Sequence, residues 1–538
     1  MTPRAGAMCV LVMAAGLVAG ALAGCGTSQP STPAPAAAQS GGRGGGNAGD
    51  GGSGGNGNSG GAGSGGSGGG AETPAGSGGA AAGPPDAGQA SGGSSPPGDA
   101  ASGDSGPAAP PPAEAEQPLP ACLKTTPVAE SGALAAAITA AQAGDCLVLA
   151  DGNYSFPVIT KTATEAAPIV IRAEHRLKAT VTSGSIALVD AAYVTLEGLT
   201  FSSSGNIKLT DSHHCRISRL RIQPVDTTDV DWVEVAGTSH HVRIDHNDFG
   251  PKTKLSNMLM LSGKGAQVVQ YNQIDHNYFH DIAYGGGNGW ETIRAGLSHL
   301  APSQAFTVIE YNLFRNTAGD PETISIKSSD NEIRYNTFRD VPGEMTLRHG
   351  NRNHVYGNYI LGGNNGIRVC GSEHLIYNNY IAGVKSGRGI WLEGGDGDGI
   401  DVPGKQHYRV YRTQVVNNTV VGGTIDVGGG HPLQPVDCTV ANNLARGIGT
   451  GGTGTRYLGN LTAPVPPGAP AAGTAPGQIE KLALGHPAID ASLGQFDFVK
   501  DDIEGQPRDK SDVGADELSE APVLRHSLTE ADVGPEAP

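Results

Sequence analysis

Two carboxylates, a lysine and an arginine stand in segments whose composition departs from the rest of the chain. Asp320 and Glu322 are separated by a single residue, so in an extended strand their side chains point to the same side. Lys327 follows in the same segment, and Arg348 lies in the next segment of this kind. Calcium prefers oxygen ligands such as paired carboxylates, and a lysine beside a bound cation can act as a general base.

This combination of groups suits β-elimination from a uronate-containing polysaccharide. The C5 proton of a uronate is weakly acidic until the adjacent carboxylate is neutralised, and a calcium ion would stabilise the enolate-like intermediate. Lys327 would remove that proton, and Arg348 or a water molecule would assist the departing O4. The structural alternative is that these residues form ordinary ion pairs on a protein surface.

A short repeat supplies the elements that must position these residues. Each copy has alternating apolar residues, then Asn, then an aromatic or aliphatic residue. The base interval is about 21 to 25 residues, which is typical of a solenoid, and the β-branched and aromatic bias predicts a parallel β-helix. Leucine-rich repeats share the period, but their Leu-x-x-Leu-x-Leu core is absent. The key asparagines are Asn247, Asn277, Asn312, Asn336, Asn358, Asn379, Asn418 and Asn443.

The repeated asparagines are interpreted as structural. Asn tolerates the left-handed backbone conformation, and its amide can hydrogen-bond to the next Asn in the stack. The interval from Lys327 to Arg348 matches one repeat, so we expect these two residues to be stacked on adjacent rungs. Upstream, the Ala-rich residues 131–142 form an amphipathic stretch. We expect a helix there that caps the amino-terminal end of the solenoid, where the core would otherwise face water.

The amino-terminal part of the chain differs sharply from the repeat region. An uncharged run ends in Leu22-Ala-Gly-Cys25, which resembles the lipobox of bacterial lipoproteins, so residues 1–25 are interpreted as a signal with Cys25 as the lipidated residue. Residues 26–117 hold 30 of the 84 glycines and no Val, Ile, Leu, Phe, Tyr or Trp, which predicts a disordered tether. The expected location is therefore the outer membrane or the cell surface, with membrane contact only through Cys25.

The remaining length divides into a β-helix domain, 118–500, and an acidic tail, 501–538. The tail has 3 basic and 11 acidic residues, whereas residues 121–500 have 30 basic and 34 acidic residues. The excess negative charge thus lies in the tails, and the middle of the chain can still bind a polyanion. We expect an anionic polysaccharide as its partner, no nucleic acid, and a monomer.

Five cysteines follow the signal. Cys122 and Cys146 bracket the expected helix, and we expect them to form a disulfide at the start of the folded domain. Cys215, Cys370 and Cys438 lie in strand-like contexts and are interpreted as buried small side chains.

Three strings of residues resemble polysaccharide lyase family six, which contains alginate lyases and chondroitinase B. They are Gly319-Asp-Pro-Glu-Thr-Ile-Ser-Ile-Lys-Ser328, Leu347-Arg-His-Gly-Asn351 and Gly366-Ile-Arg-Val369, in this order and at these spacings. The resemblance implies an all-β, right-handed parallel β-helix with a calcium-assisted mechanism. It further implies the following roles: Lys327 as base and Arg348 as acid; Asn288, Asp320 and Glu322 as calcium ligands; His349 and Arg368 as residues lining the substrate groove. Asp320 is a departure, because the family usually has Glu there.

Four functions fit these residues to different degrees. Alginate is the expected substrate, because every sugar carries a carboxylate and Lys327, Arg348 and Arg368, with Arg294 as a further candidate, could supply one cation per sugar. A dermatan or chondroitin sulfate lyase comes second, and it would favour an aromatic platform and a dense basic cluster. A uronan C5-epimerase begins with the same proton abstraction but needs a second acid or base. A non-catalytic β-helical adhesin would leave the lysine, the arginine and the carboxylates with no reason to cluster.

Overall fold

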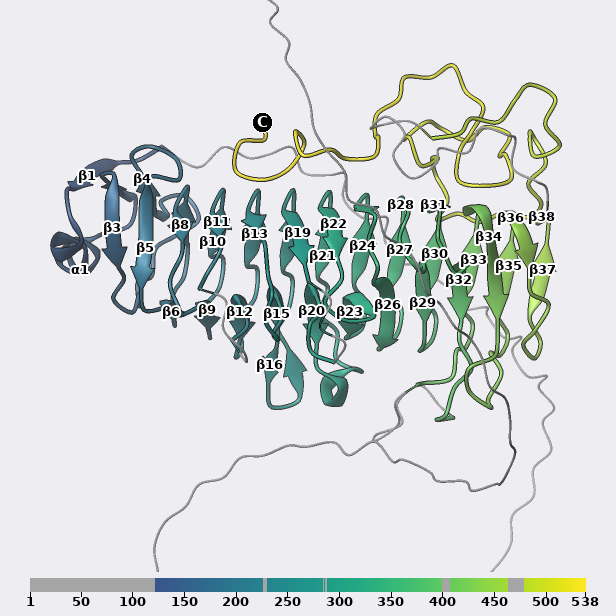
Figure 1. The fold of residues 1–538 in the computed structure, drawn as a ribbon, viewed down its shortest axis with the longest axis horizontal. Helices are drawn as coiled ribbons and strands as arrows, with labels where there is room; N and C mark the ends of the chain where they lie inside the picture. The colour runs from purple at the N-terminus through teal and green to yellow at the C-terminus, as the bar shows by residue number, and fades with distance from the viewer. Residues whose placement is uncertain (1–120, 226–229, 284, 286–287, 399–406, 463–478) are drawn as a thin grey trace, which may run out of the picture. The chain divides into compact units, whose positions relative to one another are not determined.

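The computed structural model describes residues 121–538 apart from 226–229, 284, 286–287, 399–406 and 463–478. The expected signal and tether, including Cys25, lie outside the described residues. The described chain is a right-handed parallel β-helix, as predicted, in which short strands recur in the same order on successive rungs (Figure 1). No described helix is long and apolar enough to span a membrane.

The first ladder of parallel strands forms one sheet that runs the length of the solenoid. Its members are short, which leaves room for the tight corners between ladders. They are β1 (Lys124–Val128), β2 (Asp145–Leu149), β4 (Ile169–Ala173), β7 (Val194–Glu197), β10 (Arg216–Ser218), β13 (Arg243–Asp245), β18 (Gln273–Asp275), β21 (Val308–Glu310), β24 (Glu332–Arg334), β27 (His354–Tyr356), β30 (Leu375–Tyr377), β33 (Gln414–Val416), β35 (Thr439–Ala441) and β37 (Arg456–Leu458).

The second ladder follows the first after the corner that holds the repeated asparagines. It consists of β3 (Gly152–Ser155), β5 (Ala179–Ser183), β8 (Thr200–Phe201), β11 (Arg221–Ile222), β14 (Asp248–Phe249), β19 (Tyr278–Ile282), β22 (Leu313–Thr317), β25 (Thr337–Arg339), β28 (Tyr359–Leu361), β31 (Tyr380–Ala382), β34 (Thr419–Val427), β36 (Leu444–Ile448) and β38 (Leu461–Thr462).

The third ladder carries the segments with candidate catalytic residues. It consists of β6 (Ile186–Val189), β9 (Ile207–Thr210), β12 (Val233–Ala236), β15 (Leu259–Leu261), β20 (Ile293–Gly296), β23 (Glu322–Lys327), β26 (Glu344–His349), β29 (Ile367–Val369) and β32 (Arg388–Leu392), and it joins the second ladder at β34. A small antiparallel hairpin, β16 (Gly263–Lys264) with β17 (Gln267–Val268), and a 3-10 turn, η1 (Ser298–Leu300), project from this part of the chain.

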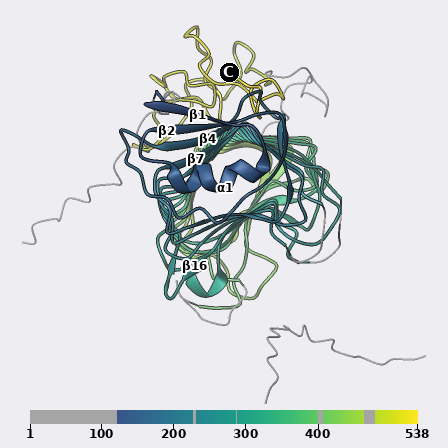
Figure 2. The same cartoon turned by 90° about the vertical axis from the view of Figure 1, so that its left-hand side faces the viewer.

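One continuous apolar core fills the coil. Like residues stack on like from rung to rung: the Phe249, Phe279, Phe314 and Phe338 rings follow one another at centroid distances of 4.7, 5.0 and 4.7 Å. At the amino-terminal end, α1 (Ser131–Ala140) buries Leu134 and Ile138 in the same core and lies across the end of the coil (Figure 2). The helix lies within the stretch in which it was expected.

The asparagine column is continuous from Asn247 to Asn443 and extends to Asn460. Each side-chain amide donates to the Oδ1 of the Asn on the next rung at 2.9 to 3.0 Å. The expectation that the asparagine itself adopts the left-handed conformation is wrong. The residue before it does, for example His246 at φ 52° and Tyr311 at φ 51°, which turns the corner and leaves the asparagine free to bond along the column.

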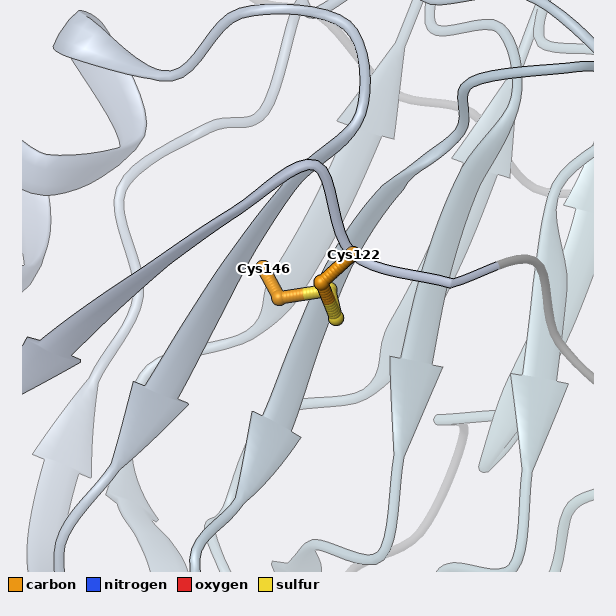
Figure 3. Close-up of a disulfide and its surroundings, with 2 residues drawn as sticks. All are labelled: Cys122 and Cys146. Atoms are coloured by element: carbon orange, nitrogen blue, oxygen red, sulfur yellow. A yellow bond between two sulfur atoms is a disulfide. The ribbon is translucent and has the colours of Figure 1, made fainter.

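The cysteine predictions agree with the structure. Cys122 and Cys146 form a disulfide with a Cα–Cα distance of 5.6 Å, which ties the segment before β1 to β2 (Figure 3). Cys215, Cys370 and Cys438 are buried free thiols.

Residues 501–538, the acidic C-terminal tail, are in contact with the β-helix. This segment packs on the β-helix: the backbone N–H of Ala515 donates to Thr419 Oγ1 at 2.8 Å, and that of Leu528 donates to Thr337 Oγ1 at 2.8 Å. Acidic side chains of the segment are paired internally, because the buried Arg508 guanidinium binds Glu517 Oε2 at 3.1 Å and several carbonyl groups. Such ion pairs make the burial of charged side chains possible.

Candidate active site

β23 and β26 place the lysine and the arginine on adjacent rungs, but not as direct partners. Ile326 pairs with Leu347, and Lys327 then pairs with His349, so Arg348 is an extra residue in β26. The sequence spacing predicted that Lys327 and Arg348 would be stacked; the bulge changes this register. A bulge re-aims side chains locally, and here it separates the Arg348 side chain from the row of Lys327 and His349.

Lys327 is buried beside a carboxylate. Its Nζ donates to Glu291 Oε1 at 3.0 Å, and both side chains are almost inaccessible to solvent, at 7% and 0% exposure. The other oxygen of Glu291, Oε2, has no hydrogen-bond partner among the described residues. A buried carboxylate oxygen without a donor is costly, so this atom is open to a further hydrogen-bond donor or a cation.

Asp320 lies at the same end of the site and is held by backbone amides. Its Oδ1 accepts from the N–H of Glu322 at 2.7 Å, and its Oδ2 accepts from those of Gly289 and Trp290 at 3.1 Å each. Burial raises the pKa of Asp320 to about 7, and the negative charges of Glu291 and Glu322 add to this effect. Asn288, the third expected calcium ligand, is exposed and directly precedes Gly289.

Glu322 connects the carboxylates to the arginines. Its Oε1 lies 3.7 Å from Arg348 Nε and 3.8 Å from Arg368 Nη1, and its Oε2 accepts a hydrogen bond from Ser325. The paired carboxylates predicted from the sequence therefore share this part of the site. However, Asp320 precedes β23 while Glu322 begins it, so the two do not lie on one strand face.

Arg368 is at the centre of a second group of carboxylates. Its Nη1 lies 3.5 Å from Glu344 Oε1, and its Nη2 lies 2.7 Å from Glu393 Oε2. Burial raises the pKa of Glu344 to about 7 despite Arg368, with Glu322 and Glu393 contributing in the same direction. Arg368 Nη2 also approaches His407 Nε2 at 3.1 Å, and burial together with the two arginines lowers the pKa of that histidine to about 3.

The two remaining expected groove residues have different surroundings. His349 is buried and packs against Tyr408 at a ring-centroid distance of 4.8 Å. Arg294 is half-buried in β20, in the same cross-rung row as Ser325, Thr346 and Arg368. Arg294 thus shares one row with Arg368, whereas Lys327 belongs to another.

Sequence reasoning missed Glu291, Glu344 and Glu393. Two of them could have been found from the rung interval. The interval from Glu291 to Glu322 equals that between the register partners Arg294 and Ser325. Glu344 is the direct register partner of Glu322. Glu393 gave no such signal, because its role depends on the contact with Arg368.

The charges of the site do not balance among the described residues. It combines five carboxyl groups with three basic side chains: Glu291, Asp320, Glu322, Glu344 and Glu393 against Lys327, Arg348 and Arg368. An anionic substrate would be repelled unless some carboxyls are protonated or a cation is bound. Asp320, Glu322 and the unpaired Glu291 oxygen offer the oxygen ligands that a hard divalent cation prefers, but these three side chains are not among the groups of described residues whose ligand atoms all lie within 4.8 Å of one another.

Comparison with known proteins places these residues in context. The family model of chondroitinase B matches residues 128–428. Among solved structures, a mannuronic acid specific polysaccharide family 6 lyase from human gut microbiota is 28% identical, covering 62% of this chain and 83% of that chain, with a TM-score of 0.55. No curated protein matches the sequence.

Two further solved structures share the architecture. The family 6 alginate lyase AlyGC is 27% identical, covering 60% of this chain and 47% of that chain, with a TM-score of 0.52. A family 6 polysaccharide lyase from Pseudopedobacter saltans is 22% identical, covering 76% of this chain and 99% of that chain, with a TM-score of 0.56. At 22% identity the last comparison supports the fold alone.

Proposed function

Because the chain belongs to the chondroitinase B family and is a polysaccharide lyase, we propose that it cleaves alginate by calcium-assisted β-elimination at the site around Lys327. The observation that carries the proposal is the placement of Lys327 and Arg348 on adjacent rungs beside a surplus of buried carboxyl groups. Membership of a lyase family argues against the adhesin and epimerase alternatives.

The proposed calcium ligands are Asp320 and Glu322, with Asn288 close by. The orphaned Glu291 oxygen and the excess of carboxyl over basic groups both favour a cation here. Calcium would neutralise the uronate carboxylate and so make the C5 proton more acidic. Asp320 has a shorter side chain than the usual Glu, but its two oxygens are already oriented by three backbone amides.

Lys327 is the proposed base, and Glu291 positions it. The 3.0 Å hydrogen bond fixes the Nζ in a site with little water, so the amine can be presented to a bound sugar in one orientation. Arg348, held by Glu322, is the proposed acid that assists the departing O4.

The experiment is incubation of the purified chain with poly-mannuronate, poly-guluronate, mixed alginate, dermatan sulfate and chondroitin sulfate. The ultraviolet absorbance of the unsaturated product reports elimination directly. We expect an absorbance increase on alginate that a calcium chelator abolishes and added calcium restores. Full activity after chelation would contradict the calcium role and leave the lyase assignment standing.

Alginate is favoured over the sulfated polymers by two observations. Relatives at 27% and 28% identity are described as an alginate lyase and a mannuronic acid specific lyase. In addition, Lys327 is paired with Glu291, and Arg348 and Arg368 share Glu322, so these basic side chains are already matched by carboxylates and leave no basic surplus for a sulfate group. The family model carries the name chondroitinase B, so dermatan or chondroitin sulfate is the second candidate. Faster cleavage of dermatan sulfate than of all three alginate substrates would show that the sulfated polymer is the preferred substrate.

We also propose that a lipid on Cys25 tethers the enzyme to the bacterial cell surface. This rests on the Leu22-Ala-Gly-Cys25 string and the Gly-rich stretch that follows it. Fractionation of cells expressing the wild-type chain and Cys25→Ala tests it: the wild type should be found with the outer membrane and the variant in the soluble fraction. Wild-type protein that is soluble and unmodified would contradict the tether.

A further inference from the structure

Four histidines gather at one corner of the β-helix, away from the strands that carry the proposed active site. His213 and His214 precede β10, and His240 and His241 precede β13. The interval between the two pairs equals that between the register partners Arg216 and Arg243. The pairs are therefore stacked on adjacent rungs, and His213 and His240 form a parallel bridge.

The ring nitrogens of these histidines converge. His213 Nδ1 and His214 Nδ1 are 2.9 Å apart, and His240 Nδ1 and His241 Nδ1 are 2.8 Å apart. Between the rungs, the rings stack at centroid distances of 4.9 Å for His213 with His240 and 4.5 Å for His214 with His241. Ligand nitrogens of His214, His240 and His241 all lie within 4.8 Å of one another.

Stacking at the corner does not by itself require histidine. His214 and His241 have φ of 53° and 52°, and the same corner position is occupied by Tyr193 at 55° and Tyr271 at 54°. Tyr193 stacks on His214 at 4.6 Å, and Tyr271 stacks on His241 at 4.9 Å. This column of stacked rings thus accepts tyrosine as well as histidine. Its two histidines, His214 and His241, are nevertheless each preceded in the sequence by another histidine.

The adjacent row gives the same result. His213 and His240 are flanked in their bridge row by Ala192 and Gln270, so this row has no need of an imidazole either. Two independent rows therefore have histidine on the same two rungs. What the four side chains share is a set of ring nitrogens that lie close to one another.

The electrostatic environment keeps most of these rings neutral. Burial lowers the pKa of His214, His240 and His241, and the neighbouring histidines lower it further, while Glu165 opposes this effect at His214. Neutral imidazole is the form that ligates metals. His241 is exposed and His240 half-buried, so an ion in solution can reach the cluster.

We propose that His214, His240 and His241, with His213 hydrogen-bonded to His214, form a binding site for one late divalent transition-metal ion, such as zinc, nickel or copper. An all-imidazole set of ligands suits these borderline ions and not calcium, which prefers oxygen. The site is separate from the lyase chemistry, because it lies on the rungs of β10 and β13 and uses none of the residues around β20, β23, β26 and β29.

The test uses the mature chain without a polyhistidine tag, freed of metal by a chelator and then dialysed. Zinc is titrated by calorimetry, and the electron paramagnetic resonance spectrum of bound copper reports nitrogen ligands. We expect the wild type to bind zinc at this site and copper to show coupling to several nitrogens. The double variant His214→Tyr, His241→Tyr should bind zinc at least about tenfold more weakly and lose that copper signal.

The tyrosine variant is matched to the fold, because Tyr193 and Tyr271 already occupy the same column. A second variant, His213→Gln with His240→Gln, follows Gln270 in the other row and remains informative if the first does not fold. His299→Tyr, at an exposed histidine in η1, is the control and should leave binding unchanged. Zinc affinity and copper spectra equal to wild type in both cluster variants would overturn the proposal.

Discussion

The asparagine column and the charged face around β23, which carries Lys327, Arg348, Arg368 and the carboxylates beside them, arise from the same rung geometry. They differ in how completely their polar groups are paired. Both stack polar side chains from successive rungs. In the column every rung contributes the same amide, and each amide both donates and accepts along the stack. On the charged face each rung contributes a different side chain, and a bulge at Arg348 breaks the register.

This difference shows how a solenoid separates stability from chemistry. Identical neutral groups satisfy one another completely, so the column needs no external partner. Basic and acidic groups present in unequal numbers cannot all pair with one another. The charged face therefore keeps an unpaired oxygen on Glu291 and raised pKa values at Asp320 and Glu344. Such groups are available to a cation and an anionic sugar.

The largest expected effect is on the charged face. Lys327→Met should lower kcat by about 10² to 10⁴ because it removes the general base. Lys327→Met also leaves the buried Glu291 carboxylate without its positive partner, which could lower stability. The double variant Lys327→Met, Glu291→Gln controls for this effect: it should unfold at a temperature near that of the wild type yet remain inactive. Activity of Lys327→Met close to that of the wild type would contradict the assignment.

The next effect should be on stability and not on rate. Asn358 Oδ1 accepts from both the backbone N–H and the Nδ2 of Asn336, and its own Nδ2 donates to Asn379 Oδ1, so Asn358→Ala leaves the buried backbone N–H of Asn336 without its acceptor. Such a group costs about 1 to 3 kcal/mol. Urea unfolding should show this loss, with kcat of the folded fraction close to wild type. A large loss of kcat in the folded variant would show that the column also shapes the site.

Glu291→Gln should have an intermediate effect on rate. The amide keeps the size of the side chain but makes a weaker hydrogen bond to Lys327 Nζ, so the base is held less firmly in one orientation and we expect kcat to fall about 10-fold to 10²-fold. Steady-state kinetics measures the change in kcat, and thermal unfolding checks that the variant is folded. Unchanged kcat would remove Glu291 from the site and leave it a purely structural partner of Lys327.

The smallest effect is expected at the end of the asparagine column. Asn460 is part-buried and completes the stack by accepting from Asn443, so only one neighbour loses its acceptor in Asn460→Ala. Water can replace that bond, and the loss in unfolding free energy should be below about 1 kcal/mol. A loss equal to that of Asn358→Ala would contradict the view that the column owes its stability to burial.

Much of the site was evident from local sequence. The string around Asp320, Glu322 and Lys327 suggested the proposed chemistry, and the resemblance to a lyase family rested on the same residues. What failed was the register: stacking Arg348 on Lys327 because they are one repeat apart assumes a regular rung, and the structure places His349 there instead. A one-residue bulge leaves no mark in the spacing of a repeat whose length already varies.

The solenoid, the asparagine column and the disulfide between Cys122 and Cys146 could all be predicted from the amino-acid sequence. These follow from periodicity and residue type, because each rung repeats the same local interactions. The folded chain, in contrast, revealed that Glu291 reaches Lys327 from the preceding rung, and that Arg508 binds Asn378 of the β-helix while it pairs with Glu517. Local sequence indicates neither contact, because whether a charged side chain is solvated or buried in a pair is set by its folded surroundings rather than by composition.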